Sequence, residues 1–286
     1  MNILAIESSC DETAVAIVRD GREVLTDCIA SQVALHREYG GVVPEIASRK
    51  HIEAIYPLAD QALKEAGLTR TDIDAVAVTY APGLIGAVLV GVNFAKAAAM
   101  ALKKPLIPVH HIRGHIAANY LAYPELEPPF LCLVVSGGHT MIIEVKDYTD
   151  MRILGTTLDD AAGECFDKVG RVLGMPYPGG AALDKAAQQG DETKYPLPVA
   201  KSGENPYNMS FSGLKTATLN LIHHAQQVGE ELDIPSLCAS FTAAVSETLV
   251  PRVVRALEET GYRKVAVAGG VAANSRIRHD ILEAAK

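Results

Sequence analysis

Apolar and polar positions along this chain form one local pattern that occurs twice, about half a chain apart. The first copy begins with the apolar run 3–6 and the polar loop 7–13, and the second begins with the apolar run 131–135 and the small-residue loop 136–140. In each copy two further apolar runs follow, separated by a polar turn, at 14–18 and 24–29 and at 141–145 and 153–156. Each copy therefore predicts strand, tight loop, strand, turn and strand.

The matching positions of the two loops predict nucleotide binding. A loop of small residues between two strands leaves backbone N–H groups available to point at an anion. Two such loops predict a grip on one phosphate chain from both sides, which is the arrangement of a two-lobed nucleotide-binding fold. Two unrelated hairpins are the alternative interpretation of the same pattern.

Helical and extended segments alternate through the rest of the chain. A short strand at 75–79, a long helix at 85–102 and a strand at 106–109 form a β-α-β unit with a parallel crossover. A strand at 264–268 ends in Gly269-Gly270 and a helix start, a turn typical of base- or ribose-binding sites. Periodicity predicts further helices at 44–66, 113–121, 161–173, 181–189, 214–224 and 236–259. The polar, turn-rich stretch 195–211 is expected to be an ordered segment that leaves the helices and strands and returns to them.

The best linker is the segment 124–129, which holds three prolines and two glutamates in six residues. It lies just before the second copy of the hairpin, so we expect an N-terminal lobe at 1–125 and a C-terminal lobe at 126–286. The pattern is still helical at Lys286, from which we expect a chain that is truncated at its C-terminus.

Composition narrows the class of protein. The chain has 286 residues, is 49% hydrophobic, and contains 23 glycines and no tryptophan, which is typical of an α/β protein with a large core. The apolar stretch 84–102 is interrupted by Asn93 and Lys96, so it predicts a core helix rather than a membrane span. The first residues have no basic stretch, so we expect no signal peptide, and five scattered cysteines without a CxxC pair predict reduced thiols in the cytoplasm.

The net charge limits the ways in which this chain would bind a nucleic acid. A charge of −8 and a pI near 5.6 count against binding over a broad basic face. Binding through a local patch or through a partner stays open. The candidate patches, each also typical of a solvated surface, are 49–50, 103–104 and Arg276 with Arg278.

His111 and His115 are four residues apart, which on a helix places their Cβ atoms roughly 5–6 Å apart on one face, close enough to share a metal ion. Surface or packing histidines are the alternative. A zinc protease would need Glu directly after the first histidine, and this chain has Ile112 there, so we exclude that class. A third ligand would have to come from elsewhere, with His139 or an acidic residue beyond the chain as candidates.

Four carboxylates are candidate site residues. Asp11 and Glu12 lie at the tip of the first loop, where they would hold a phosphate-bound metal or position a nucleophilic amine, or would only solvate the loop. Asp167 follows the second hairpin and Asp184 lies just beyond Gly179-Gly180. Both would accept hydrogen bonds from ribose or substrate hydroxyls, and each taken singly is also typical of a surface carboxylate.

Taken together, these motifs resemble the TsaD (Gcp/YgjD) family of tRNA threonylcarbamoyladenosine transferases, in its bacterial form. The resemblance spans the whole chain. It rests on the segments Glu7-Ser-Ser-Cys-Asp-Glu-Thr13, His111-Ile-Arg-Gly-His115, Ser136-Gly-Gly-His-Thr140, Gly163-Glu-Cys-Phe-Asp-Lys168, Tyr177-Pro-Gly-Gly180, Phe211-Ser-Gly-Leu-Lys215 and Gly269-Gly-Val-Ala-Ala-Asn274.

The resemblance implies an actin-like, sugar-kinase-like ATPase (ASKHA) fold of two ribonuclease-H-like lobes. It implies transfer of threonylcarbamoyl from threonylcarbamoyl-AMP to the exocyclic amine of the adenosine beside the anticodon, in tRNAs that read ANN codons. His111 and His115 match ligands of one iron or zinc ion, with a third ligand, an aspartate, expected beyond Lys286. Asp11 and Glu12 match acidic residues linked to activity. Positions that match contacts to the adenylate substrate are Val134, Val135, Ser136, Gly137, Gly138, Asp167, Gly180, Asp184 and Asn274.

The resemblance also implies partners and a location. It implies tRNA as substrate, the partner proteins TsaB and TsaE, bound adenine nucleotide, no membrane, and a cytoplasmic enzyme. A small-molecule kinase or ATPase of the actin-like superfamily, or a non-catalytic nucleotide-binding partner protein, are the alternatives. The kinase would not need the histidine pair, and the non-catalytic protein should lack both that pair and Ser136-Gly-Gly-His-Thr140, so their presence favours the transferase.

Overall fold

The computed structural model describes residues 1–201 and 203–286. The chain divides into two compact units, Met1–Glu125 and Leu126–Lys286. Each unit is built around its own sheet and its own hydrophobic core.

The N-terminal unit contains a five-stranded sheet in the order β3-β2-β1-β4-β5. β1, β2 and β3 are antiparallel neighbours, whereas β1, β4 and β5 are parallel. The strands are β1 (Asn2–Glu7), β2 (Glu12–Arg19), β3 (Glu23–Ser31), β4 (Ala75–Ala81) and β5 (Leu106–His110). The helices are α1 (Val33–Arg37), α2 (Pro44–Glu65), η1 (Arg70–Asp72), α3 (Ile85–Leu102) and α4 (His111–Ala122).

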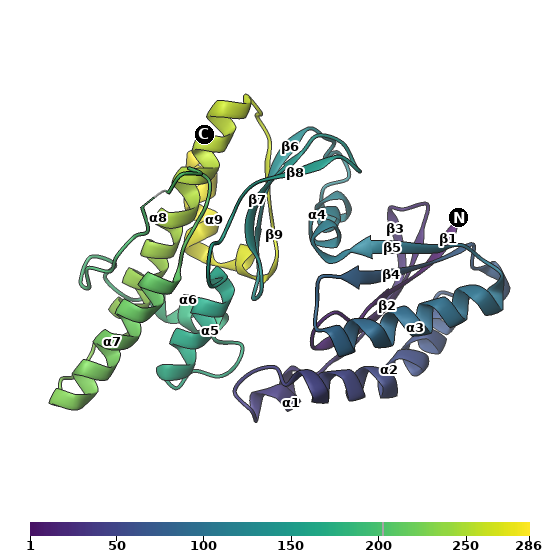
Figure 1. Cartoon of the computed structure of the whole chain (residues 1–286), viewed down its shortest axis with the longest axis horizontal. Coiled ribbons are helices and arrows are strands. Elements are labelled where there is room, and N and C mark those ends of the chain that lie inside the picture. Colours follow the sequence, from purple (N-terminus) through teal and green to yellow (C-terminus); the bar gives the residue numbers. More distant parts are fainter. Residues whose placement is uncertain (202) are drawn as a thin grey trace. The chain divides into compact units, whose positions relative to one another are not determined.

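Alternation along β2 decides which face of this sheet is buried most deeply. Val15 and Ile17 are fully buried in the core, whereas Ala14 and Ala16 are half-buried on the opposite face. Helices α2 and α3 lie side by side along the sheet, as Figure 1 shows. α2 contributes a buried stripe at helical spacing: Ala47, His51, Ile55, Leu58, Ala59, Ala62 and Leu63.

Helix α3 is a core helix on one face only, which corrects the expectation for the apolar stretch 84–102. Its buried face consists of small residues: Ala87, Gly91, Ala95 and Ala99. Its outer face exposes large apolar residues: Ile85, Leu89 and Met100. A uniformly apolar sequence has no polar positions to mark the solvent side, so the sequence pattern concealed this difference.

The C-terminal unit contains a four-stranded sheet in the order β8-β7-β6-β9. The strands are β6 (Phe130–Val135), β7 (Thr140–Val145), β8 (Met151–Thr156) and β9 (Val265–Ala268). The helices are α5 (Ala162–Val172), α6 (Gly179–Ala187), α7 (Ser212–Val228), α8 (Ile234–Thr260), η2 (Gly270–Ala273) and α9 (Ser275–Ala284). All six residues of β6 are buried, so this strand is the centre of the unit.

Helix α8 is the main core helix of this unit, with α6, α7 and α9 in contact with it (Figure 1). By length and composition alone both α3 and α8 would suffice to cross a membrane. The apolar windows of the two helices are 28% and 78% buried, respectively. The length and hydropathy of α8 therefore reflect its place inside the unit.

The repeated pattern expected from the sequence is present in both sheets. β1 pairs antiparallel with β2 and parallel with β4, and β6 pairs antiparallel with β7 and parallel with β9. The last pair before the connecting loop is Glu7 with Ala14 in one copy and Val135 with Thr140 in the other. The duplicated strand hairpin is thus confirmed, and the two loops occupy equivalent positions in their sheets.

Helix α4 begins two residues earlier than the periodicity predicted. It starts at His111, directly after β5 ends at His110, with no connecting loop and no side-chain cap to mark the start. The earlier start places both His111 and His115 on this helix.

The polar segment 195–211 contains no helix or strand among its described residues, and Arg252 of α8 holds it in place. The Arg252 guanidinium donates to the carbonyl oxygens of Asn208 (2.8 Å), Ala200 (3.0 Å) and Thr248 (2.7 Å). Arg252 is only 6% exposed, and burial lowers its pKa. The excursion is therefore ordered by a buried cation that is satisfied by backbone carbonyls.

Candidate functional site

The loop after β1 is fixed to helix α3 by its two serines. The fully buried Ser8 donates its hydroxyl to the carbonyl oxygen of Ala87 at 2.9 Å, inside α3. The Leu84 N–H, at the start of the same helix, donates to the carbonyl oxygen of Ser9 at 2.8 Å. Because Gly83 packs directly on Ser9, an added Cβ there would lie 2.6 Å from the Ser9 carbonyl oxygen. The loop and the helix start form one rigid unit.

The next two residues of the loop are held by other elements. His51 of α2 donates to the carbonyl oxygen of Cys10 at 3.0 Å. The Gln32 N–H donates to the carbonyl oxygen of Asp11 at 3.0 Å. Asp11 is half-buried and Glu12 is exposed, so both carboxylates stand at the surface on a fixed backbone. The structure therefore places the two predicted catalytic residues on a rigid support.

His111, the first residue of α4, contacts the same loop. Its Nδ1 atom lies 3.1 Å from Ser9 Oγ and 3.3 Å from the Glu7 carboxylate. Burial raises the pKa of Glu7, but hydrogen bonds from His111, from Ser9 and from Thr79 outweigh it and hold the pKa at about 2. Glu7 is thus an anion that can only accept a hydrogen bond, which favours the His111 tautomer with its proton on Nδ1.

The histidine pair has the chemistry of part of a metal site. The rings of His111 and His115 are 4.5 Å apart between centroids and cross at 79°. A carboxylate behind one imidazole, oriented as Glu7 is, is the usual support of a histidine that binds metal through Nε2. In the part of the chain that the structure describes, no cluster of three or more His, Cys, Asp or Glu side chains surrounds a common point. These residues fit two ligands of a metal ion and not a complete set.

An apolar cavity of about 230 Å³ opens on the half-buried face of the sheet. Alanines form most of its floor, at positions 5, 14, 16 and 77. Glu7, Thr79 and Gly114 lie at its edge. The small side chains of three strands thus leave space beside Glu7, the carboxylate that contacts His111, and larger residues would fill that space.

In the C-terminal unit, the loop 136–138 presents backbone donors. The Ser136 N–H donates to the His139 carbonyl oxygen at 2.8 Å, and the Ser136 hydroxyl accepts from the His139 N–H at 3.1 Å. Neither the Gly137 nor the Gly138 N–H has an acceptor among residues 1–201 and 203–286. An added Cβ at either glycine would meet no atom within 4 Å. The loop therefore offers two N–H groups to a ligand on an open side.

Two other glycines allow this loop to pack closely on its neighbours. Gly163, in the first turn of α5, donates its N–H to the Ser136 carbonyl oxygen at 3.2 Å. A Cβ at Gly163 would lie 2.4 Å from that same oxygen. Gly269 has φ +94° and a Cβ there would lie 2.4 Å from the Val135 carbonyl oxygen. The sequence identified these glycines as motif members, and the structure gives the steric reason.

Val134 and Val135, predicted as substrate contacts, lie in β6 with fully buried side chains. Asp167 accepts the Gly179 N–H at 2.8 Å and so supports the start of α6, the helix that contains Gly180. Asn274 caps α9 by accepting the Ile277 N–H at 3.0 Å. These predicted site residues therefore have structural roles that the sequence did not reveal.

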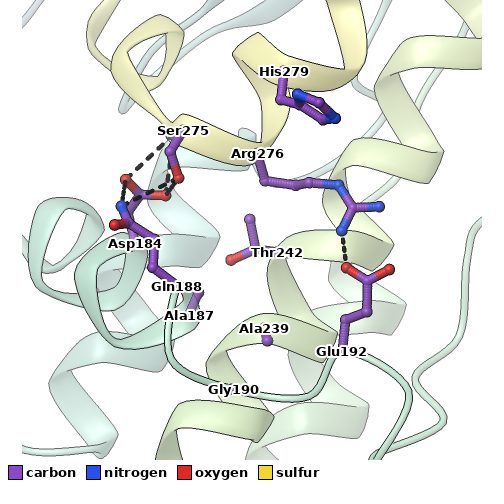
Figure 2. Close-up of a pocket in the computed structure, with 10 residues that line it drawn as sticks. All are labelled: Asp184, Ala187, Gln188, Gly190, Glu192, Ala239, Thr242, Ser275, Arg276 and His279. Atoms are coloured by element: carbon purple, nitrogen blue, oxygen red, sulfur yellow. Dashed lines mark hydrogen bonds and ion pairs between the residues drawn. The ribbon is translucent and has the colours of Figure 1, made fainter. Parts of the chain in front are cut away.

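Asp184 connects α6 to α9 and lines a cavity of about 270 Å³ (Figure 2). Its carboxylate accepts from the Ser275 hydroxyl at 2.8 Å and from the Ser275 N–H at 3.1 Å. Arg276 reaches across the cavity to form an ion pair with Glu192 (Figure 2). Other residues of the lining, which sequence reasoning missed because no local motif contains them, include Gln188, Thr242 and His279.

The predicted residues thus form one group in each unit. In the N-terminal unit, the loop with Asp11 and Glu12 and the histidine pair are joined through Glu7 and Ser9. In the C-terminal unit, the loop 136–138 follows β6, and Gly269 packs against Val135 at the end of that strand. Asn274 caps α9, and the next residue, Ser275, donates to Asp184.

The family model described as "TsaD: tRNA N6-adenosine threonylcarbamoyltransferase" matches residues 23–286. A protein of that name from Moorella thermoacetica is 58% identical over 283 residues, covering 99% of this chain and 83% of the relative. Another from Clostridium botulinum is 52% identical over 286 residues, covering 100% of this chain and 84% of the relative.

Solved structures are similar in fold at low sequence identity. HypF from T. kodakarensis superposes with a TM-score of 0.65 at 14% identity, covering 99% of this chain and 43% of HypF. The (R)-2-hydroxyglutaryl-CoA dehydratase component A from Acidaminococcus fermentans has a TM-score of 0.55 at 15% identity, covering 99% and 88%. A ROK hexokinase from Thermus thermophilus has a TM-score of 0.52 at 15% identity, covering 99% and 88%.

Proposed function

Because this chain belongs to the TsaD family and is a tRNA N6-adenosine threonylcarbamoyltransferase of the actin-like ASKHA fold, we propose that its two loops divide the reaction between them. The loop 136–138 binds the phosphate of threonylcarbamoyl-AMP. The loop with Asp11 and Glu12 acts on the attacking amine. Family membership decides against a small-molecule kinase and against a non-catalytic nucleotide-binding protein.

One observation carries the phosphate assignment. The N–H groups of Gly137 and Gly138 have no acceptor in the described part of the chain, on a loop that Ser136 and Gly163 hold rigid. Preorganised backbone N–H groups stabilise an anion without any rearrangement when it binds. When the anhydride bond breaks, negative charge grows on the departing AMP phosphate, so the same donors stabilise the leaving group.

The nucleoside end of the adenylate is assigned to the residues around Asp184. Its carboxylate lies on the wall of the 270 Å³ cavity, between α6 and α9. A ribose hydroxyl would donate to Asp184 as the Ser275 hydroxyl does in the structure. Three further residues would complete this part of the site: Gly180, Asp167 and Asn274. Asp167 and Asn274 would contribute backbone contacts, because their side chains already bind helix N–H groups.

The chemical step follows from the donor and the acceptor. The adenosine N6 attacks the carbamoyl carbon, a C–N bond forms, the C–O bond of the anhydride breaks and AMP leaves. Asp11 or Glu12 takes the proton that N6 loses, because both are surface carboxylates on a fixed backbone. His111 and His115 would hold an iron or zinc ion, and Glu7 would orient His111. Such an ion supplies Lewis-acid polarisation of the carbamoyl or phosphate oxygen.

We propose that TsaB and TsaE work with this chain in the cytoplasm. The chain carries a net charge of −8, so it needs help to hold a polyanionic tRNA. Helix α3 exposes Ile85, Leu89 and Met100, and its neighbour α2 exposes Ile52 and Tyr56, so these helices offer apolar surface suited to a protein partner.

Binding of adenine nucleotide to Gly137→Val tests the proposal. Valine at this position would place side-chain atoms on the open side of the loop, and loss of one good anion contact weakens affinity by about tenfold or more. Gly203→Val, at an exposed glycine outside any helix or strand that also has open space around it, is the matched control. Affinities are measured by calorimetry and transfer is measured with labelled threonylcarbamoyl-AMP and tRNA. Wild-type affinity and activity in Gly137→Val would remove this loop from the site.

A further inference from the structure

His51 is a fully buried imidazole whose two nitrogens both bond to the first loop. Nε2 lies 3.0 Å from the Cys10 carbonyl oxygen, and Nδ1 lies 2.7 Å from the Thr13 hydroxyl oxygen. A carbonyl oxygen only accepts, so Nε2 carries the proton and Nδ1 accepts from the Thr13 O–H. The ring therefore holds the residue before and the residue after the pair Asp11-Glu12.

The elements packed around His51 hold its side chain in one position. It lies one turn from Ala47 and one turn from Ile55 on the buried stripe of α2. Thr13 is itself fully buried in β2. Since the Asp11 carbonyl oxygen is bound by the Gln32 N–H, the peptide groups on both sides of Asp11 are fixed. The directions of the Asp11 and Glu12 side chains follow from this backbone.

We infer that His51 is a positioning residue for transfer: it fixes the backbone that aims Asp11 and Glu12 at the amine. It touches no substrate, because its side chain has no exposed surface. The inference rests on the role proposed above for Asp11 and Glu12. A histidine that only fills the core would affect stability and leave the rate of the folded enzyme unchanged.

Two substitutions separate the two hydrogen bonds. In His51→Gln the side-chain amide reaches the position of Nε2 and keeps a donor for the Cys10 carbonyl. In His51→Asn the shorter amide reaches only the position of Nδ1, so it keeps a partner for Thr13 and leaves Cys10 unbound. Ile55→Ala, on the same buried stripe, is the control that weakens the core without touching the loop.

Activity is measured with tRNA, threonylcarbamoyl-AMP, TsaB and TsaE, and kcat is corrected for the folded fraction. We expect His51→Asn to lower kcat by about ten- to a hundredfold, the effect of misplacing a reacting group by about 1 Å. KM for threonylcarbamoyl-AMP should stay within about twofold, because substrate binding is not altered. His51→Gln should recover at least about fivefold of the lost kcat, and Ile55→Ala should lose none.

Equal kcat values for His51→Gln, His51→Asn and Ile55→Ala would overturn the inference. Amide hydrogen exchange of residues 10–13 gives a readout that does not depend on activity, and it should accelerate in His51→Asn more than in His51→Gln. If exchange and kcat respond in this way, the positioning role stands. If Asp11→Asn and Glu12→Gln keep full activity, the proposed function of the loop is wrong, whereas unchanged exchange in His51→Asn shows that the positioning role itself is wrong.

Discussion

Replacing Gly163 by alanine should destabilise the C-terminal unit, although alanine is the better helix former. The new Cβ would lie 2.4 Å from the Ser136 carbonyl oxygen, 2.7 Å from the Ser136 carbonyl carbon and 2.8 Å from Gly137 Cα. All three atoms belong to the backbone, so no side chain can turn aside. Ordinary contact begins near 3.4 Å, and the loop would have to move by about 1 Å.

The expected magnitude follows from three effects. Overpacking against backbone costs roughly 1–3 kcal/mol. Weakening the hydrogen bond from the Gly163 N–H to Ser136 costs about 1 kcal/mol more. The helix propensity of alanine returns at most about 1 kcal/mol. A net loss near 2 kcal/mol lowers the melting temperature of a unit of this size by roughly 4–8 °C.

Thermal denaturation followed by circular dichroism measures this loss, and calorimetry with adenine nucleotide measures the state of the loop. Gly137→Ala is the matched control for the melting measurement, because its Cβ would meet nothing within 4 Å. The free energy of unfolding of the control should stay within about 0.5 kcal/mol of the wild-type value. Gly163→Ala should lose stability and nucleotide affinity together. A Gly163→Ala protein that melts at or above the wild-type temperature would refute the steric argument.

Three further results are expected. Glu7→Gln should weaken zinc binding by about 10- to 100-fold in a chelator competition, since the amide orients His111 less well than the carboxylate, and equal affinity would exclude that support role. Arg252→Met should lower the free energy of unfolding by about 2–4 kcal/mol in urea, because the partly buried carbonyl oxygens of Asn208 and Ala200 lose their donor, whereas a smaller loss would mean that water replaces the guanidinium. Cys10 is exposed, but desolvation by the surrounding loop and then the Asp11 carboxylate raise the pKa of its thiol to about 12, so iodoacetamide should modify Cys10 much more slowly at pH 8 than a free thiol, and Asp11→Asn should react faster. An unaltered rate in Asp11→Asn would show that the carboxylate has no effect.

Local periodicity was sufficient for the parts of the fold that repeat. The hairpins follow from the alternation of apolar and polar residues over a few positions, and a short loop fixes the pairing register of each hairpin. The spacing of His111 and His115 would put them on one face of a helix, but the periodicity began that helix at 113, so their common place on α4 came from the structure. The early start of α4 could not be read from the sequence, because β5 passes into α4 without a turn and without a capping side chain.

The supports of the site were not predictable because they join residues that are far apart in the chain. The contact of Glu7 with His111 spans 104 positions, and that of His51 with Cys10 spans 41. Buried polar residues such as His51 interrupt an apolar stripe, and from sequence alone they are indistinguishable from a surface histidine. Ser275 likewise gave no signal, because its partner Asp184 lies 91 positions away.

The anchoring of the first loop has a consequence for protein engineering. The motif Glu7-Ser-Ser-Cys-Asp-Glu12 is short and contiguous, which makes it look portable. Its conformation, however, is set by Ala87 of α3, His51 of α2 and His111 of α4. Grafting the segment onto another β-hairpin would transfer the amino-acid sequence without its backbone conformation. A transplant that works must carry three helices with the loop, so the smallest transferable part is the entire N-terminal unit.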